Sequence, residues 1–251
     1  MKFRYKADKN GLCACVSGIE KEVKMQANSN SGMSVIIPAY NASGYLKEAV
    51  RSVRSQNWEG GLEIIVVDDG SKDSTAADAM TLGCRVISTP NQGPAAARNE
   101  GLAASSGRLI FFLDADDVLA GGAFASLSAP MIGDPGMMAV FGKARDFISP
   151  DIPEGEAKKI RCREGSYGGR LTGCAILRRE VFEEIGVFDA SLKSGETVDF
   201  MMRLRASCLR VGNIPETVLL RRLHLTNMGR TDPGGEMANY AAILRRRMRQ
   251  T

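Results

Sequence analysis

Four short apolar runs in the first half of the chain have the pattern of buried strands. They lie at residues 33–37, 63–67, 85–88 and 109–113. Their apolar residues are largely continuous rather than alternating, which is typical of parallel strands covered on both faces. Pro38 is expected to end the first run, because proline has no N–H to donate to a neighbouring strand.

Helical patterns separate these runs. Over residues 45–56, apolar residues recur at the spacing of one helix face, and Ser43 is in position to cap the helix start. Asp73 is placed to cap a second helix at residues 76–82, and Pro94 stands in the first turn of a third. Alternating strands and helices predict an α/β fold with a Rossmann-like, mostly parallel sheet flanked by helices.

The second half of the chain has a mixed pattern. We expect strands at residues 137–141, 172–177 and 216–222, helices at residues 120–129, 179–185, 196–209 and 236–248, and a charged loop at residues 148–163. Gly186 is expected to close the helix before it. The chain is thus predicted to be one domain, residues 32–251, with a polar N-terminal extension at residues 1–31. Within the domain we divide a first half, 32–120, from a second half, 121–230, and a closing helix at 231–251.

The helix that follows Gly195 combines apolar and acidic positions. Its apolar residues predict one buried face, formed by Val198, Met201, Met202, Leu204 and Cys208. Glu196 and Asp199 lie three positions apart and are expected on the other face, near the helix start.

An acidic loop follows the most apolar strand, in the sequence FFLDADDVL. It places Asp114, Asp116 and Asp117 within four positions. Asp114 and Asp116, two apart on an extended backbone, would point to the same side, where two like charges repel unless a cation lies between them. Magnesium is often held by one or two carboxylates together with substrate phosphates. The loop therefore indicates a metal that carries a phosphorylated ligand, with a solvated turn that caps the next helix as the alternative.

Composition narrows the class of protein. The 251 residues carry a net charge of only +4, although Arg245, Arg246, Arg247 and Arg249 crowd the end of the chain. No nucleic-acid motif accompanies these arginines, so they indicate a solvated helix end or a peripheral contact with anionic lipid. The six cysteines form no CxxC pair, and there is a single histidine, which disfavours a Cys/His zinc site. Without an apolar signal core or a membrane-length apolar run, we expect a soluble, cytoplasmic protein with reduced thiols.

Six motifs stand in a fixed order along the chain: SVIIPAYNAS, EIIVVDDGSKDST, GPAAARNEGLAASSGRLIFFLDADD, ILRREVFEEIGVFD, SGETVDF and RRLHLTN. In order and rough spacing the chain resembles the family 2 glycosyltransferases, from Met33 to about Asn227. The resemblance implies the GT-A fold and inverting transfer of a sugar from a nucleotide diphosphate sugar to an acceptor, with a divalent metal. It makes residues 32–120 the nucleotide-binding half and residues 121–230 the acceptor half.

The resemblance also assigns donor-side residues. Asp69 matches the residue that hydrogen-bonds the base, usually uracil, and a carboxylate is a suitable acceptor for a ring N–H. Pro38 and Tyr40 match the loop under the base, although Tyr40 could equally serve packing. Arg98 matches an arginine near the nucleotide, with an ordinary salt bridge as the alternative.

The same resemblance implies a metal site for manganese or magnesium. Asp114 and Asp116 match the DxD motif, with Asp116 as the direct metal ligand and Asp114 facing the ribose. His224, the only histidine in the chain, matches a residue that completes the metal site.

One position departs from the family. Many members have Glu-Asp at the helix start, where this chain has Glu196-Thr197. Inverting transfer needs a carboxylate that takes the proton of the attacking hydroxyl. Glu196 is our first choice for this base and Asp199 the second, with an ion pair to Arg203 as the structural alternative for Asp199.

Other classes fit less of the sequence. A nucleotide-sugar-binding protein that has lost turnover stays open because of Thr197. A receiver-type signalling domain would leave DADD and RRLHLTN unexplained, and dehydrogenases and pyrophosphorylase-type enzymes need glycine-rich loops that PAYNAS lacks. Neither the acceptor nor the oligomeric state is indicated by any motif.

Overall fold

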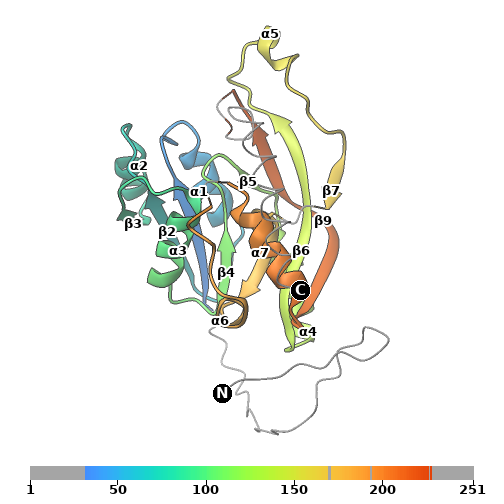
Figure 1. The fold of residues 1–251 in the computed structure, drawn as a ribbon. Coiled ribbons are helices and arrows are strands. Elements are labelled where there is room, and N and C mark those ends of the chain that lie inside the picture. The colour runs from blue at the N-terminus through green and yellow to red at the C-terminus, as the bar shows by residue number, and fades with distance from the viewer. Residues whose placement is uncertain (1–31, 169–170, 193, 226, 228–251) are drawn as a thin grey trace, which may run out of the picture.

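The computed structural model describes residues 32–168, 171–192, 194–225 and 227 (Figure 1). The predicted extension, the closing helix, the terminal arginines, Cys13 and Cys15 lie outside the described residues. The other four cysteines, Cys84, Cys162, Cys174 and Cys208, form no disulfide with one another. None of the helices in the described part is long and apolar enough to cross a membrane.

The first half alternates strands and helices, as the sequence predicts. Its strands are β1 (Met33–Ala39), β2 (Leu62–Asp68), β3 (Arg85–Ser88) and β4 (Leu109–Phe112), and its helices are α1 (Leu46–Arg54), α2 (Thr75–Thr81) and α3 (Pro94–Ala104). All four strands pair in parallel, in the order β3-β2-β1-β4. Their carboxyl ends therefore meet at one edge of the sheet, where ligands of such folds bind.

The second half adds strands of both directions. Its elements are β5 (Val118–Leu119), α4 (Ala123–Gly133), β6 (Met137–Ile148), α5 (Glu154–Ala157), β7 (Ser166–Gly168), a 3₁₀ turn (Thr172–Cys174), β8 (Ala175–Arg178), α6 (Glu180–Ile185), α7 (Glu196–Ala206) and β9 (Arg210–Leu223). β8 pairs antiparallel with β4 and β6, whereas β9 runs parallel to β6 and antiparallel to β5. The sheet is therefore parallel in its first half and mixed in its second.

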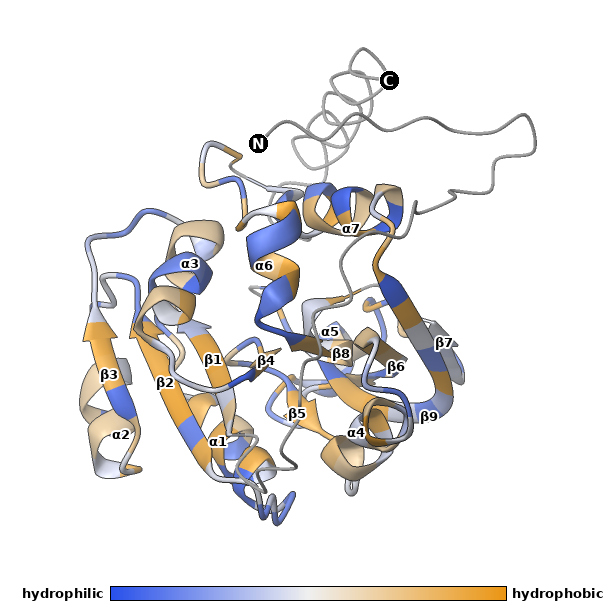
Figure 2. Ribbon diagram, turned by 90° about the horizontal axis from the view of Figure 1, so that it is seen from below, coloured by the Kyte–Doolittle hydropathy of each residue, from blue (hydrophilic) through white to orange (hydrophobic). Residues whose placement is uncertain are grey.

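Helices cover both faces of the sheet (Figure 2). α1, α2 and α4 lie on one face, where Leu46, Val50 and Phe124 pack into a core with Phe111. α3, α6 and α7 lie on the other, where the Phe112 ring packs edge-on against Phe182 and Phe188 in a second core. Because β4 is covered on both sides, its four residues are buried, and it is the central strand that its apolar run predicts.

Several predicted boundaries are wrong for identifiable reasons. Pro38 does not end β1, which continues to Ala39. Ile36 O accepts from Leu113 N on the β4 side, and β4 has left the sheet by the level of Pro38. Because the side alternates along a strand, Pro38, two residues after Ile36, also faces the β4 side, where no strand remains to accept a hydrogen bond. The absence of an N–H at Pro38 therefore breaks no bond of the sheet.

Ser43 is not the cap of α1, which begins three residues later at Leu46. Its backbone N–H donates to Asp73 Oδ2 at 3.2 Å, so the turn before α1 is tied to the loop after β2. Asp73 also accepts from Thr75 N at 3.0 Å and thereby supports the start of α2, although Ser74 is the residue that immediately precedes the helix.

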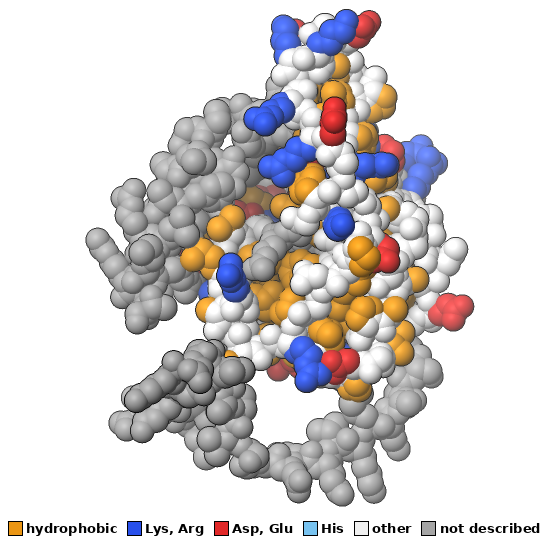
Figure 3. All heavy atoms as spheres, turned by 90° about the vertical axis from the view of Figure 1, so that its right-hand side faces the viewer, with side chains coloured by type: hydrophobic (Ala, Val, Ile, Leu, Met, Phe, Trp, Pro, Cys, Tyr) orange, Lys and Arg blue, Asp and Glu red, His pale blue; other side chains and the backbone are white. Residues whose placement is uncertain are grey.

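Two elements of the second half also differ from expectation. The strand expected at 172–177 starts only at Ala175, because residues 172–174 form a 3₁₀ turn, and the loop expected at 148–163 contains the short α5. On the face that β6, β7 and β9 present, hydrophobic side chains spread over the middle and Lys and Arg side chains gather toward the α5 end (Figure 3).

Candidate active site

The acidic loop after β4 is a turn rather than an extended segment. Asp117 N donates to Asp114 O at 3.0 Å, which closes the turn over residues 114–117. The expectation that Asp114 and Asp116 lie on an extended backbone is therefore wrong. Their carboxylates contact different partners: Asp114 Oδ1 accepts from Arg98, and Asp116 Oδ2 lies against His224.

His224 reaches the loop through the last strand of the sheet. β9 pairs with β5 in the register Val118↔Leu220, so the chain after β9 passes beside the chain that leads into β5. As a result His224 Nε2 lies 2.8 Å from Asp116 Oδ2. The Tyr45 ring packs 4.8 Å from the imidazole, between ring centroids, and helps to fix its position.

Asn227 completes this contact, and the sequence patterns did not single out its function. Its Nδ2 donates to Asp116 Oδ2 at 3.2 Å, and its Oδ1 accepts from His224 N at 2.6 Å. The signal in the sequence is the spacing of RRLHLTN, which places an amide three residues after the histidine, within reach of the same loop.

The pair Asp116 and His224 suits a divalent cation. Neighbouring ligands of an octahedral magnesium ion stand about 3 Å apart, since each lies at about 2.0–2.1 Å from the metal. The 2.8 Å between Asp116 Oδ2 and His224 Nε2 is close to that separation. Within the described residues no three His, Cys, Asp or Glu side chains gather as a metal-binding group. The protein would thus supply two ligands and leave the others to phosphate oxygens and water.

Arg222 holds the acidic loop from behind, and sequence reasoning missed it as well. The residue is buried; its backbone N donates to Asp117 Oδ1 at 2.9 Å and its Nε to Asp116 O at 2.8 Å. Its remaining nitrogens donate to Ser149 Oγ at 3.2 Å and to the Glu48 carboxylate. The guanidinium therefore joins the loop to α1 and to the end of β6.

Asp117 is the buried member of the acidic loop. Burial, together with the charges of Asp116 and Asp114, raises the pKa of Asp117 well above its ordinary value, and the bond from Arg222 N opposes the rise. Asp114 and Asp116 retain more contact with solvent, with side chains 49% and 26% exposed. Only these two carboxylates of the loop are accessible to a ligand.

Glu196 begins α7, after Gly195 in the left-handed conformation (φ 84°). Its Oε1 accepts from Arg98 at 2.7 Å. The buried polar side-chain atoms that lack a partner in the described part are Trp58 Nε1 and Arg98 Nε. Glu196 is itself buried, and its Oε2 accepts no hydrogen bond from a described residue.

The expected orientation of α7 is right for Met201 and Leu204, which are buried, but wrong for the two carboxylates. Glu196 and Asp199 belong to its buried face, together with Phe200, Met201 and Leu204, whereas Val198 and Met202 are half-buried and Cys208 is exposed beyond the helix end. Apolar periodicity could not anticipate that both carboxylates have arginine partners, the buried Arg98 and the partly buried Arg203. Those partners offset the cost of removing the charges from water.

Asp199 has the structural partner that the sequence suggested. Its Oδ2 accepts from Arg203 Nε at 2.9 Å. Arg203 in turn donates to the carbonyl oxygens of Ile185, the last residue of α6, and of Gly186 (3.1 Å) and Val187 (2.7 Å), which follow it. Asp199 thus fixes the arginine that caps the end of α6, a structural contact rather than an open one.

Arg98 lies between the acidic loop and α7. Its two terminal nitrogens donate to Glu196 Oε1 at 2.7 Å and to Asp114 Oδ1 at 2.8 Å. Burial alone would lower the pKa of Arg98, but the two carboxylates outweigh it and raise the pKa above its ordinary value. The arginine is therefore a permanent cation whose described bonds go to two protein carboxylates; contact with a nucleotide stays a prediction.

The residues expected under the base lie at the ends of β1 and β2. Asp69 N donates to Ala39 O at 2.8 Å, which places Asp69 beside the Pro38–Tyr40 segment, and Tyr40 is exposed. The Asp69 carboxylate accepts from Thr89 Oγ1 (3.1 Å), Gln92 N (2.9 Å) and Gly93 N (2.7 Å). It braces the loop before α3, and these three bonds occupy three of the roughly four acceptor positions of the carboxylate.

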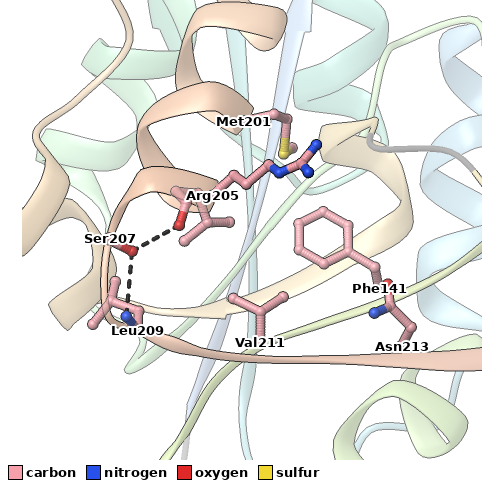
Figure 4. Close-up of a pocket in the computed structure, with 8 residues that line it drawn as sticks. Phe141, Met201, Arg205, Ser207, Leu209, Val211 and Asn213 are labelled. Carbon is pink, nitrogen blue, oxygen red and sulfur yellow. Dashed lines mark hydrogen bonds between the residues drawn. The ribbon is translucent and has the colours of Figure 1, made fainter. Parts of the chain in front are cut away.

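A separate cavity of about 250 Å³ lies between α7 and the strands β6 and β9 (Figure 4). Its walls are Phe141, Met201, Leu204, Arg205, Ser207, Leu209, Val211 and Asn213. No residue singled out from the sequence as a site residue lines it. The candidate active site is instead the edge of the sheet where Asp116, His224, Asp114 and Glu196 gather.

Comparison with known proteins agrees with this fold. Residues 34–186, more than half of the chain, match the family described as Glycosyl transferase family 2. An uncharacterized glycosyltransferase of Rickettsia typhi, RT0329, is 28% identical over 217 residues, which cover 80% of this chain and 67% of the relative. The pre-mycofactocin glycosyltransferase of Mycobacterium tuberculosis is 31% identical over 195 residues, 70% of this chain and 39% of the relative.

Among solved structures, S. aureus TarS 1–349 in complex with UDP-GlcNAc has a similar fold. The TM-score is 0.62 at 21% identity, over 78% of this chain and 60% of that chain. The matched residues cover only part of the length of the relatives, for example 37% of an uncharacterized glycosyltransferase of Haemophilus influenzae.

Proposed function

The chain belongs to glycosyltransferase family 2, and we propose that it transfers a sugar from a UDP-linked donor to a hydroxyl acceptor, with inversion and with a bound divalent cation. The observation that carries this proposal is the contact between Asp116 and His224, 2.8 Å apart at the carboxyl edge of the parallel strands. It supplies two ligands of suitable chemistry beside a solvent-accessible carboxylate, Asp114.

The donor's nucleotide would lie over the ends of β1 and β2. Tyr40 is exposed there, and Asp69 has one acceptor position left after its three bonds to residues 89–93. That position suits the ring N–H of uracil. The choice of UDP is supported by the solved complexes of TarS, which contain UDP or UDP-GlcNAc and share the fold.

Asp116 and His224 would hold manganese or magnesium, and Asn227 and Arg222 keep these two ligands in place. When bound, the cation neutralises charge on the diphosphate as it leaves. Asp114, half-exposed and held by Arg98, is placed to contact the ribose.

Glu196 is the proposed proton acceptor. As the acceptor oxygen forms its bond to the anomeric carbon, the bond from that carbon to the diphosphate breaks, and the electron pair leaves with UDP. The hydroxyl proton passes to Glu196 Oε2, which has no hydrogen-bond partner among the described residues. Asp199 is a weaker candidate because Arg203 engages it.

A second function remains open because of the residue after Glu196. Thr197 stands where many family members have a carboxylate, and one Glu196 oxygen is bound by Arg98. Both facts would also fit a nucleotide-sugar-binding protein without turnover. Such a protein would bind donors with the same dependence on metal but would neither transfer nor hydrolyse them.

One experiment distinguishes the two functions. The binding of a panel of nucleotide sugars is first measured by thermal shift, with manganese and with chelator. Each donor that binds is then tested for release of UDP, both in water alone and with a set of hydroxyl acceptors. Release by the wild type and not by Glu196→Gln supports the enzyme. Binding without release from any donor supports the binding protein.

A further inference from the structure

Arg98 is the charged residue of α3 that reaches farthest into the site. Its side chain is 5% exposed, and its two terminal nitrogens point to carboxylates from different parts of the chain. Asp114 lies 16 residues and Glu196 lies 98 residues further along the sequence. A single guanidinium therefore joins the donor-side loop to the start of α7.

The surroundings leave Arg98 little freedom. Its Nε is buried and has no hydrogen-bond partner within the described part of the chain, and its Cζ lies 5.7 Å from the centre of the Phe188 ring. An arginine that only needed salt bridges would gain by exposing this N–H to water. Leaving this N–H buried without a partner carries an energetic cost, which the packing around the guanidinium and its two ion pairs offset.

Two neighbouring residues on α3 fix how close Arg98 lies to the sheet and to the segment before α7. At Gly101 a Cβ atom would lie 2.3 Å from Ile36 Cγ2, so only glycine lets the helix approach β1 this closely. Asn99 exchanges two hydrogen bonds with the backbone of Phe188, at 2.8 and 3.0 Å. These contacts tie α3 to the sheet and to the segment that leads into α7, and thereby fix Arg98 relative to Glu196.

We propose that Arg98 is a positioning residue that acts through Glu196. By binding Oε1 at 2.7 Å it leaves Oε2 for the acceptor hydroxyl, and its second bond, to Asp114, fixes the position of Glu196 relative to the acidic loop. Arg98 is thus assigned to the geometry of proton acceptance rather than to the nucleotide. The inference rests on the proposed function and adds a residue to its mechanism.

The test is a double-mutant cycle of Arg98→Met and Glu196→Gln, read by UDP affinity and by turnover at saturating donor. Arg98→Met is expected to keep UDP affinity within about threefold and to lose turnover by roughly 10²-fold, since misplacing a reacting group by about 1 Å has such an effect. In the Glu196→Gln background the same change should cost no more than about threefold, because the base through which Arg98 acts is already absent.

Arg203→Met is the matched control. It removes another arginine that binds a buried carboxylate of the same helix, Asp199, at 2.9 Å. Its effect on turnover should add to that of Glu196→Gln, since it does not contact that residue. Additive effects for Arg98 as well would overturn the inference, and so would loss of UDP affinity with turnover at saturating donor unchanged.

A stability cycle separates this inference from the proposed function. The unfolding free energies of the same variants measure the coupling of Arg98 to Glu196. If Arg98→Met does not fold, Arg98→Lys takes its place. Coupling without turnover of any donor contradicts the proposed function alone. Absence of coupling contradicts the inference whether or not the protein turns over a donor.

Discussion

His224 Nε2 lies 2.8 Å from Asp116 Oδ2, although 108 residues separate the two in the chain. The contact arises because β9 and β5 are neighbours in the sheet, so their ends reach the same edge. It brings the only histidine of the chain to the acidic loop, where an imidazole and a carboxylate offer two ligands to one cation.

UDP is expected to stabilise the protein against heat only when manganese or magnesium is present. The diphosphate would reach Asp116 and His224 through the cation, and at a concentration 100 times the Kd a ligand stabilises by about 2.7 kcal/mol. Differential scanning fluorimetry with UDP, in manganese and in chelator, measures the effect. An equal shift in chelator would contradict the cation bridge.

Asp116→Asn and His224→Ala are each expected to weaken manganese binding by at least about 10-fold, since even the loss of an outer partner of a metal ligand has that effect. Titration of free manganese by electron paramagnetic resonance gives the affinity directly. Asp134→Asn is the control, because that carboxylate pairs with Arg210 and contacts no residue of the site. If His224→Ala bound manganese as tightly as the wild type, the histidine would be structural.

Asp69→Ala should weaken the binding of uridine itself, with or without metal, because its contact is to the base and not to the phosphates. Some loss of stability is also expected, since three hydrogen bonds to residues 89–93 are removed. Thr89→Val removes one of those three bonds and leaves the carboxylate. Calorimetry with uridine should therefore separate the two variants, and equal losses would assign Asp69 to the loop alone.

Glu196→Gln should retain UDP-sugar affinity and lose turnover by about 10²- to 10⁴-fold, the usual contribution of a general base. Asp199→Asn should instead lower the free energy of unfolding by about 1–3 kcal/mol, because it weakens the partly buried hydrogen bond between Asp199 and Arg203. Release of UDP and chemical denaturation provide the two measurements. The opposite pattern, with Asp199→Asn inactive and Glu196→Gln active, would make Asp199 the base.

Gly101→Ala is expected to destabilise the protein by about 1–3 kcal/mol, as overpacking of a filled core does. The added methyl would lie 2.3 Å from Ile36 Cγ2 and 3.1 Å from Val67 Cγ2. Gly121→Ala, where a Cβ meets nothing within 4 Å, is the matched control for denaturant unfolding. Equal stability of both variants would show that α3 can move away from the sheet without loss.

The sequence by itself determined the order of elements in the first half and the edge of the sheet at which its acidic residues lie. Continuous apolar runs identify β1, β2 and β4 because parallel strands bury both faces, and the acids that follow them must lie at one edge. Arg203 as partner of Asp199 was equally predictable, since residues four apart on a helix are neighbours. These features depend on residues close together in the chain, so they can be recognised in the sequence.

Only the tertiary structure decided which groups contact one another across long separations. Periodicity placed Glu196 and Asp199 on the exposed face of their helix, because it treats a carboxylate as a group that needs water. In the folded chain Arg98, which lies 98 residues away from Glu196, supplies the opposite charge that lets Glu196 be buried. The continuation of β1 through Pro38 is likewise a tertiary effect, because it depends on where the neighbouring strand β4 ends.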